Sequence, residues 1–237
     1  MTQFEIKDKP LALLIPGLDG TGLLYYRQVD GLAVRHRVLP WAFRPRASFV
    51  YDDLIEELGR ATSGEKPGSI VVVGESFGGT IAMHYALTYP ERISRLVLIN
   101  TFARYRNRLR IRLACRLAPL LHFAWVRAIK DFITEQMLAR EGVPLECRRR
   151  YYEIIQLVDR AAYQRRLELV RDVSLVERLQ EIAIPTLVFA SGRDKIVPSR
   201  REARLMASRI PNARLYEFPR AGHALLLTAG FSLADYL

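Results

Sequence analysis

A serine framed by glycines is the strongest candidate for chemistry in this chain. The motif GESFG at 74–78 follows the β-branched run IVVV at 70–73 and precedes an alanine-containing helical pattern. A Gly-x-Ser-x-Gly pattern is informative only in this strand–turn–helix setting, where the serine hydroxyl stands clear at the end of a buried strand. The helix also points its N-terminal N–H groups at a developing oxyanion. We therefore predict that Ser76 is a nucleophile.

His223 is the predicted base, because a serine hydroxyl is a poor nucleophile until a base takes its proton. This histidine follows the last predicted strand, at 213–219, and Gly222 before it permits a tight turn. The other three histidines lie at the start of a strand candidate, in the helix after the serine, and in an all-helical region: His36, His84 and His122. None of these three follows a predicted strand directly.

Asp194 is the predicted acid, which would orient the imidazole and stabilise its cation. It follows a buried-strand pattern at 186–192 and precedes Pro198. The chain between Asp194 and His223 has room for one helix and one strand. The order serine, aspartate, histidine is that of the α/β-hydrolases. The end of the preceding strand, the alternative place for the acid, carries Asn100.

The loop PGLDGTG at 16–22, here named the oxyanion loop, follows the apolar run at 11–15. A tetrahedral intermediate needs two donors aimed at its oxygen. We predict these donors to be the backbone N–H groups of Phe77 and Leu18, while Asp19 either caps the next helix or holds the loop. A phosphate-binding loop is the alternative, but no Gly-Lys-Ser/Thr follows these glycines.

Short apolar runs alternate with longer helical patterns, which predicts a mostly parallel sheet with helices on both faces, the α/β-hydrolase fold. The predicted strands cover 11–15, 36–43, 70–74, 96–100, 186–192 and 213–219. The predicted helices cover 23–33, 48–62, 77–89 and 199–209.

Residues 102–181 interrupt this alternation. They lack strand-like runs and carry Leu, Ile, Phe and Trp at helical spacing, so we predict three to five helices inserted as a cap, or lid. The core would then comprise residues 1–101 and 182–237. Apolar side chains of the cap either line a substrate channel or pack between helices. The tentative substrate-binding residues are Leu121, Phe123 and Trp125.

The net charge of +11 is concentrated in this cap. Residues 103–181 hold 17 lysines and arginines against 10 aspartates and glutamates. The excess indicates either a solvated, arginine-rich surface or an anionic partner. As partner we expect an acidic acyl carrier protein or an anionic membrane surface. Nucleic acid is not expected, because the chain carries no recognition motif for it.

Several function classes have no support in the composition. There is no run of eighteen apolar residues and no apolar segment near the N-terminus, so neither a spanning helix nor a signal peptide is expected. The only cysteines, Cys115 and Cys147, lack a metal-ligand spacing. We expect a cytoplasmic protein without a metal or organic cofactor.

These residues resemble the α/β-hydrolase superfamily over essentially the whole chain. Within it, LLIPGLDGTG at 13–22 and VGESFGG at 73–79 look like the hydrolase domain of esterase/acyltransferase-like proteins related to plastid phytyl ester synthases. The acyltransferase region of those proteins has no counterpart here. The first two antiparallel strands of the fold would be absent or reduced to residues 3–6. Proline iminopeptidase-like and carboxylesterase members share the same elbow, which therefore does not select among them.

The expected function is a serine hydrolase that cleaves a carboxylic ester or thioester of a hydrophobic acyl chain through an acyl-enzyme. One alternative is acyl transfer, in which an alcohol replaces water on the same triad. Another is a catalytically silent fold used as a binding module. The same triad also serves lyases, aminopeptidases and perhydrolases, because fold and nucleophile do not specify a substrate.

Overall fold

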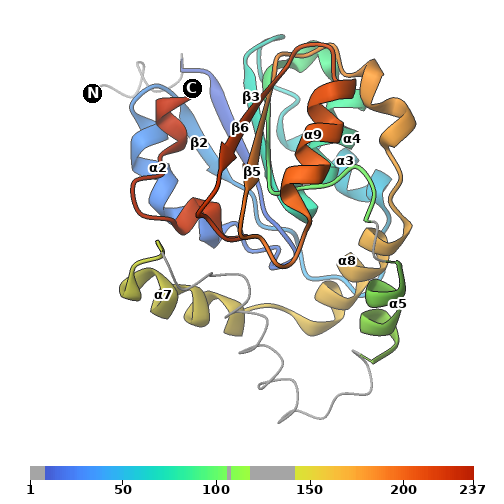
Figure 1. The fold of residues 1–237 in the computed structure, drawn as a ribbon. Helices are drawn as coiled ribbons and strands as arrows, with labels where there is room; N and C mark the ends of the chain where they lie inside the picture. Colours follow the sequence, from blue (N-terminus) through green and yellow to red (C-terminus); the bar gives the residue numbers. More distant parts are fainter. Residues whose placement is uncertain (1–8, 106–107, 118–141) are drawn as a thin grey trace.

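A computed structural model of the chain describes residues 9–105, 108–117 and 142–237. It contains a sheet of six strands in the order β2-β1-β3-β4-β5-β6, and every neighbouring pair is parallel (Figure 1). The strands are β1 Leu11–Ile15, β2 Arg37–Pro40, β3 Ile70–Glu75, β4 Ile93–Ile99, β5 Thr186–Ser191 and β6 Ala213–Phe218. This topology confirms the predicted fold class.

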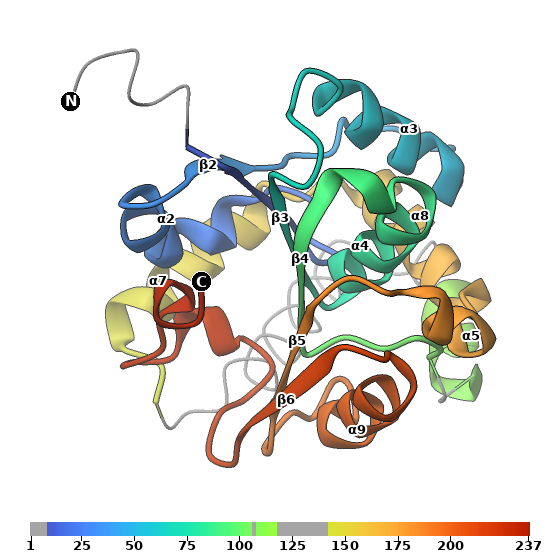
Figure 2. The same cartoon turned by 90° about the horizontal axis from the view of Figure 1, so that it is seen from above.

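The sheet is covered on both faces, so its central strands are mostly apolar rather than alternating. β1, β3 and β5 are buried at every position. One face packs against α3 Tyr51–Ala61, α4 Phe77–Thr88 and α9 Ser199–Arg209 (Figure 2). The other packs against α2 Tyr26–Ala33 and the C-terminal 3₁₀ turns Leu225–Leu227 and Leu233–Asp235.

The strand and helix boundaries differ from the prediction mainly at β2 and β4. The predicted strand 36–43 ends at Pro40, since the chain then turns toward the oxyanion loop, where the Phe43 N–H donates to the Gly20 carbonyl over 2.9 Å. β4 begins three residues earlier than predicted, at Ile93, because pairing with β3 extends through its exposed and half-buried positions. The predicted helix 23–33 divides into a 3₁₀ turn Leu23–Tyr25 and α2.

The described part of the cap consists of helices and contains no strand. Its elements are α5 Arg108–Leu117, α7 Leu145–Gln156, α8 Arg160–Asp172 and the 3₁₀ helix Val176–Glu181. Helices α7 and α8 lie across the edge of the sheet where the strands end (Figure 1). Tyr151 and Ile154 of α7 join an apolar cluster with Leu24 and Leu227, which lie on the 3₁₀ turns Leu23–Tyr25 and Leu225–Leu227. The cap is therefore packed onto the loops that carry the predicted site.

The described residues contain neither a membrane-spanning helix nor a cluster of metal ligands. No helix among them combines the length and apolarity needed to cross a bilayer. No group of three His, Cys, Asp or Glu side chains in that part of the chain is arranged to hold a metal ion. Cys115 and Cys147 are buried, free thiols.

Candidate active site

Ser76 stands at the turn between β3 and α4 in a backbone conformation that side chains rarely adopt, with φ 54° and ψ −121°. Three hydrogen bonds hold this turn. The Ser76 N–H donates to the Ile99 carbonyl of β4 over 2.9 Å, and the Ser76 carbonyl accepts from the Gly79 N–H at 3.0 Å and the Thr101 hydroxyl at 2.5 Å. The surrounding strands therefore impose the strain that lifts the hydroxyl out of the sheet.

The glycines on either side of Ser76 are required by close backbone contacts. A Cβ at Gly74 would overlap the Gly78 carbonyl, and a Cβ at Gly78 would overlap the carbonyl oxygens of Ile15 and Pro16. The first contact sets α4 against its own entering strand. The second sets the start of α4 against the end of β1, where the oxyanion loop begins. Glycine at these two positions therefore allows the loop and the serine to lie side by side.

Ser76, His223 and Asp194 form a continuous hydrogen-bonded chain. The Ser76 Oγ lies 3.0 Å from Nε2 of His223, and Nδ1 of the same ring lies 2.7 Å from Oδ2 of Asp194. Both the imidazole and the carboxyl group are 1% exposed. An ionised carboxylate accepts a hydrogen bond from the Nδ1–H group, which keeps the proton on Nδ1. Nε2 therefore has a free lone pair and can take the serine proton.

Three further donors hold the Asp194 carboxylate. Its Oδ1 accepts the N–H groups of Ile196 at 2.8 Å and Val197 at 2.9 Å, and its Oδ2 accepts the Ser199 hydroxyl. Burial alone would raise the pKa of Asp194, but the imidazole and these donors outweigh it and keep that pKa below its usual value. Ser199 was not among the residues predicted from the sequence. The Pro-Ser pair at the start of a predicted helix was the available signal.

Asn100, which stands at the alternative position for the acid, forms a hydrogen bond to the backbone of His223. It directly follows β4 with φ 45°, and its Nδ2 donates to the His223 carbonyl at 2.7 Å and the Ser191 hydroxyl at 2.9 Å. Its Oδ1 accepts the Ser191 N–H at 2.9 Å. The Asn100 amide supplies both a donor and an acceptor, whereas an ionised carboxylate at this position would supply acceptors alone. Asn100 therefore ties β4 and β5 to the histidine loop.

The oxyanion loop lies directly against the nucleophile. A Cβ added at Gly17 would lie 3.6 Å from the Ser76 Cβ. Among the described residues, the backbone N–H groups of Leu18 and Phe77 have no acceptor. Asp19 holds the loop, since its Oδ2 accepts the Thr21 N–H at 2.9 Å and the Thr21 hydroxyl at 2.6 Å.

Glu75 is a buried carboxyl group beside the nucleophile that the sequence analysis did not assign a role. It is 7% exposed. Burial, followed by the charges of Asp19 and Asp194, raises its pKa to about 8, against the opposing influence of His223. Glu75 is therefore mainly protonated and neutral at neutral pH.

The remaining predicted positions lie away from this chain of hydrogen bonds or outside the described residues. His84 stacks on the Tyr51 ring at a centroid distance of 4.5 Å, and His36 is buried near the start of β2. Burial lowers the pKa of both imidazoles. The residues outside the described part of the chain are Leu121, His122, Phe123 and Trp125.

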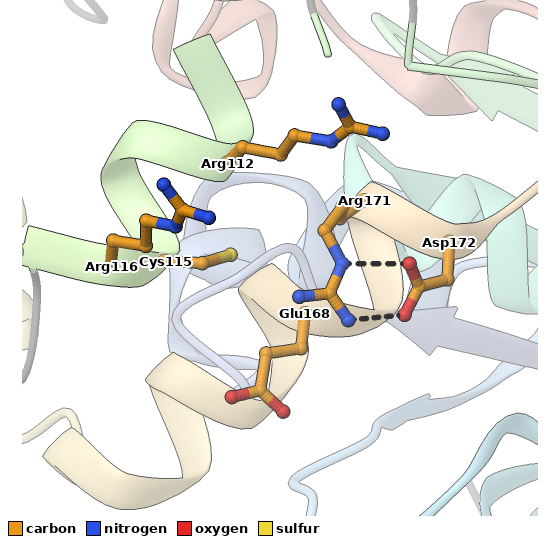
Figure 3. Close-up of a pocket in the computed structure, with 6 residues that line it drawn as sticks. All are labelled: Arg112, Cys115, Arg116, Glu168, Arg171 and Asp172. Carbon is orange, nitrogen blue, oxygen red and sulfur yellow. Dashed lines mark hydrogen bonds and ion pairs between the residues drawn. The ribbon is translucent and has the colours of Figure 1, made fainter. Parts of the chain in front are cut away.

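A hollow of about 560 Å³ lies between α5 and α8 (Figure 3). Arg171 forms two hydrogen bonds to the neighbouring Asp172 there, at 2.7 and 2.6 Å. Arg112 and Arg116 also line the hollow, and neither has a carboxylate partner among the described residues. The full lining is Arg112, Cys115, Arg116, Glu168, Arg171 and Asp172. It contains none of the three residues of the hydrogen-bonded chain.

Comparison with known proteins identifies the family of this chain. Residues 42–228 match the family model described as serine aminopeptidase, S33. The chain belongs to this family. As an S33 member it is a hydrolase of the α/β-hydrolase superfamily, which confirms the resemblance predicted from the sequence.

The S33 member is similar in sequence to proteins with different names. It is 27% identical over 95% of its length to a Serratia proteamaculans protein that bears the provisional name carbamate hydrolase RutD, and it covers 90% of that protein. It is 28% identical to phytyl ester synthase 1 of Arabidopsis thaliana, over 96% of this chain but only 36% of that protein. The two names refer to different bonds, so they do not specify which bond this chain cleaves.

Solved structures support the fold in the same way. The esterase of Exiguobacterium antarcticum superposes on the S33 member with a TM-score of 0.81, covering 92% of this chain and 86% of the esterase. The two sequences are 18% identical. At this identity the likeness establishes the fold and leaves the substrate open.

Proposed function

We propose that this S33 hydrolase cleaves a carboxylic ester or thioester of a hydrophobic acyl chain through an acyl-enzyme on Ser76. The observation that carries the proposal is the hydrogen-bonded chain from Ser76 through His223 to Asp194, built on a strained strand-to-helix turn. Nucleophile and base are within hydrogen-bond reach, and a third group orients the base.

The reaction has two halves of similar form. Ser76 Oγ bonds to the carbonyl carbon while its proton passes to Nε2 of His223, and the electron pair of the carbonyl moves to its oxygen. The Leu18 and Phe77 N–H groups donate to that oxyanion. The pair then returns, the bond to the alcohol or thiol breaks, and the leaving group takes the proton from His223. Water repeats these steps on the acyl-enzyme and releases the acid.

Removal of the nucleophile tests the mechanism. We expect Ser76→Ala to abolish turnover of p-nitrophenyl esters and covalent labelling by a fluorophosphonate, with an unchanged circular dichroism spectrum. Ser63→Ala is the matched control, because Ser63 is exposed and bonds only to the Arg60 carbonyl within the described structure. Wild-type activity in Ser76→Ala would refute the assignment.

A substrate panel tests the class of bond. It should contain esters of increasing acyl length, a thioester, a carbamate and an aminoacyl substrate, since one nucleophile can attack all of these carbonyls. We expect kcat/KM to be highest for an ester or thioester with a medium-to-long chain. A preference for the carbamate or the aminoacyl substrate would replace the proposed substrate while keeping the mechanism.

Acyl transfer to an alcohol is the second candidate, and the similarity to a phytyl ester synthase favours it. The acyl-enzyme would be the same, with a long-chain alcohol in place of water in the second half. Product analysis with added alcohol separates the two outcomes. A silent binding module is the third candidate, and it requires that the fluorophosphonate leave Ser76 unlabelled in the wild-type protein.

For the partner, we propose that the basic cap docks an acidic acyl carrier protein, with an anionic membrane surface as the competing partner. Support comes from Arg112 and Arg116 at the hollow between α5 and α8, whose charges are uncompensated among the described residues. The exposed Leu109 and Leu113 lie beside them on α5. A surface that combines apolar and cationic side chains suits a carrier with both acidic and apolar contacts.

A further inference from the structure

Arg166 is a buried arginine of the cap that touches the oxyanion loop. It lies on α8 and is 2% exposed. Its Nε donates to the Leu18 carbonyl at 2.8 Å, and its Nη2 donates to the Asp19 carbonyl at 3.1 Å. Within the described residues no carboxylate lies within ion-pair distance of it. Removing a guanidinium from water is costly, and the hydrogen bonds to these two carbonyls offset that cost.

The two carbonyls that Arg166 binds belong to consecutive peptide units. A planar guanidinium with parallel donors fixes both units at once, as a single ammonium does not. The Leu18 N–H, the proposed oxyanion donor, belongs to the peptide unit between Gly17 and Leu18. The Leu18 carbonyl belongs to the next unit, between Leu18 and Asp19. Rotation of this donor away from Ser76 would therefore disturb the hydrogen bonds to Arg166.

The loop is shaped to receive the guanidinium. Gly20 has φ +71°, and a Cβ there would lie 2.7 Å from the central carbon of the Arg166 guanidinium. The Gly20 N–H donates to the Gly17 carbonyl at 3.1 Å, which closes a turn around Leu18 and Asp19. The Asp19 carboxylate is held by Thr21 and faces the arginine only at longer range. Backbone carbonyls are thus the direct partners of Arg166.

We propose that Arg166 is a positioning residue that locks the oxyanion loop in its donor geometry, so that docking of α8 sets the oxyanion hole. The proposal rests on the proposed function, because it assigns Leu18 as a donor to the transition state. It also makes the cap part of the catalytic apparatus through a contact between residues 148 positions apart in the sequence. Arg166 itself touches the loop rather than the substrate.

The neighbouring Arg165 provides a matched control. It lies on the same helix, its Nε donates to the Phe49 carbonyl at 2.6 Å, and its Nη1 pairs with Glu168 at 2.7 Å. Arg165 therefore also ties α8 to a core carbonyl, but one outside the oxyanion loop. A general effect of weakening the α8 contact should appear in both variants, whereas an effect on the oxyanion hole should appear only at Arg166.

The first test measures catalysis in Arg166→Met, Arg166→Lys and Arg165→Met. Active sites are counted by the endpoint of fluorophosphonate labelling, so that kcat refers to folded enzyme. We expect Arg166→Met to lower kcat about 10- to 100-fold, because a displaced donor stabilises the transition state poorly. KM should change by less than about threefold, since the ground-state carbonyl depends little on that donor. Arg166→Lys, which keeps the charge, should lie between, and Arg165→Met near wild type.

A trifluoromethyl ketone inhibitor adds a readout that a merely structural role would not change. It forms a tetrahedral oxyanion on Ser76, so its affinity should fall in parallel with kcat across the Arg166 variants. A kcat per titrated site within about twofold of wild type in both Arg166 variants would overturn the proposal. An equal loss in Arg165→Met would overturn it as well.

Hydrogen–deuterium exchange tests the tether without any substrate. Arg166→Met should raise exchange in the peptide covering residues 16–22, while Arg165→Met should not. If the wild-type protein cleaved no ester but this exchange still rose, the proposed function would fail and the tether would stand. Unchanged exchange in an ester-cleaving enzyme would refute the tether and leave the function intact.

Discussion

The imidazole of His223 experiences opposing influences on its pKa. Burial favours the neutral ring, while the charge and hydrogen bond of Asp194, with a further contribution from Glu75, favour the cation. The cationic influences prevail, and the pKa of His223 is raised above its ordinary value of 6.5. The ring must be neutral to accept the serine proton, so activity requires a pH above this raised pKa.

The pH profile of kcat/KM should reflect this balance. We expect an ascending limb with its midpoint above pH 6.5. Asp194→Asn removes the largest raising influence, so the limb should move to lower pH while kcat falls about 10³- to 10⁴-fold from loss of the correct tautomer. The measurement is ester hydrolysis from pH 5 to 9 with both proteins. A midpoint that stayed in place in Asp194→Asn would contradict this explanation.

Glu75 should make wild-type stability depend on pH. Its folded pKa is about 8 and its ordinary value is 4.5, so between these values the folded state holds a proton that the unfolded chain has lost. The free energy of unfolding must then fall as pH rises through that window. Glu75→Gln cannot ionise and should gain stability relative to wild type from pH 5 to 8, by on the order of a few kcal/mol.

Urea unfolding followed by tryptophan fluorescence at each pH measures this difference. His223 and Asp194 are present in both proteins, so their own titrations largely cancel in the comparison. A constant difference across the window would show that Glu75 titrates normally.

The start of α4 is the element that brings the site together. Its first turn packs against β3, the end of β1 and the Thr101 side chain. In α4 these contacts are made by the backbone of Gly78 and Gly79, which have no side chain. The helix is buried on nearly every side, so it cannot move outward to relieve an added atom. The contacts therefore leave no room at Gly78 for even a methyl group.

Gly78→Ala should consequently lower the free energy of unfolding by several kcal/mol or prevent folding, since overpacking against backbone has no flexible side chain to absorb it. Gly64→Ala is the control, because a Cβ there meets nothing within 4 Å. Thermal unfolding of the two variants decides the point. Equal melting temperatures would mean that the contact between α4 and the end of β1 yields easily.

Charge acts at the scale of the whole molecule. Of the net +11, the larger share belongs to the cap, and Arg112 with Arg116 is its clearest uncompensated pair among the described residues. Uneven charge of this kind steers association and responds to salt, with little influence on the chemistry at a distant serine. The partner and the catalytic centre should therefore be separable by mutation.

The double variant Arg112→Glu/Arg116→Glu should raise KM for an acyl chain on an acidic carrier protein about tenfold or more and should leave kcat/KM for a small p-nitrophenyl ester within about twofold. Arg35→Glu, an exposed arginine at the end of α2, is the control for a change of charge alone. If the carrier-bound substrate were unaffected while binding to anionic vesicles fell, the partner would be a membrane surface.

Much of the fold follows from local pattern. Apolar runs such as LALLI and IVVVG are long enough to specify buried parallel strands, and the helix predicted over 199–209 is α9 with the same limits. The sequence also indicated Ser76, because the elbow is a local feature in which glycine spacing, strand and helix are adjacent along the chain. The end of β2 was less predictable, since a half-buried edge strand stops where tertiary contacts draw the chain away.

The amino-acid sequence by itself indicated the nucleophile and its flanking glycines at positions 74 and 78 from a local motif, and the fold class from the alternation of apolar runs and helical patterns along the chain. Only the tertiary structure decided which side chains support them. Ser199 reaches Asp194, Asn100 holds the histidine loop, and Arg166 of α8 donates to two carbonyls of the oxyanion loop. The last two contacts join residues 123 and 148 positions apart, and no local spacing encodes such a meeting. The adjacent ends of the sheet strands bring Asn100 to the histidine loop, and packing of α8 on the oxyanion loop brings Arg166 to Leu18.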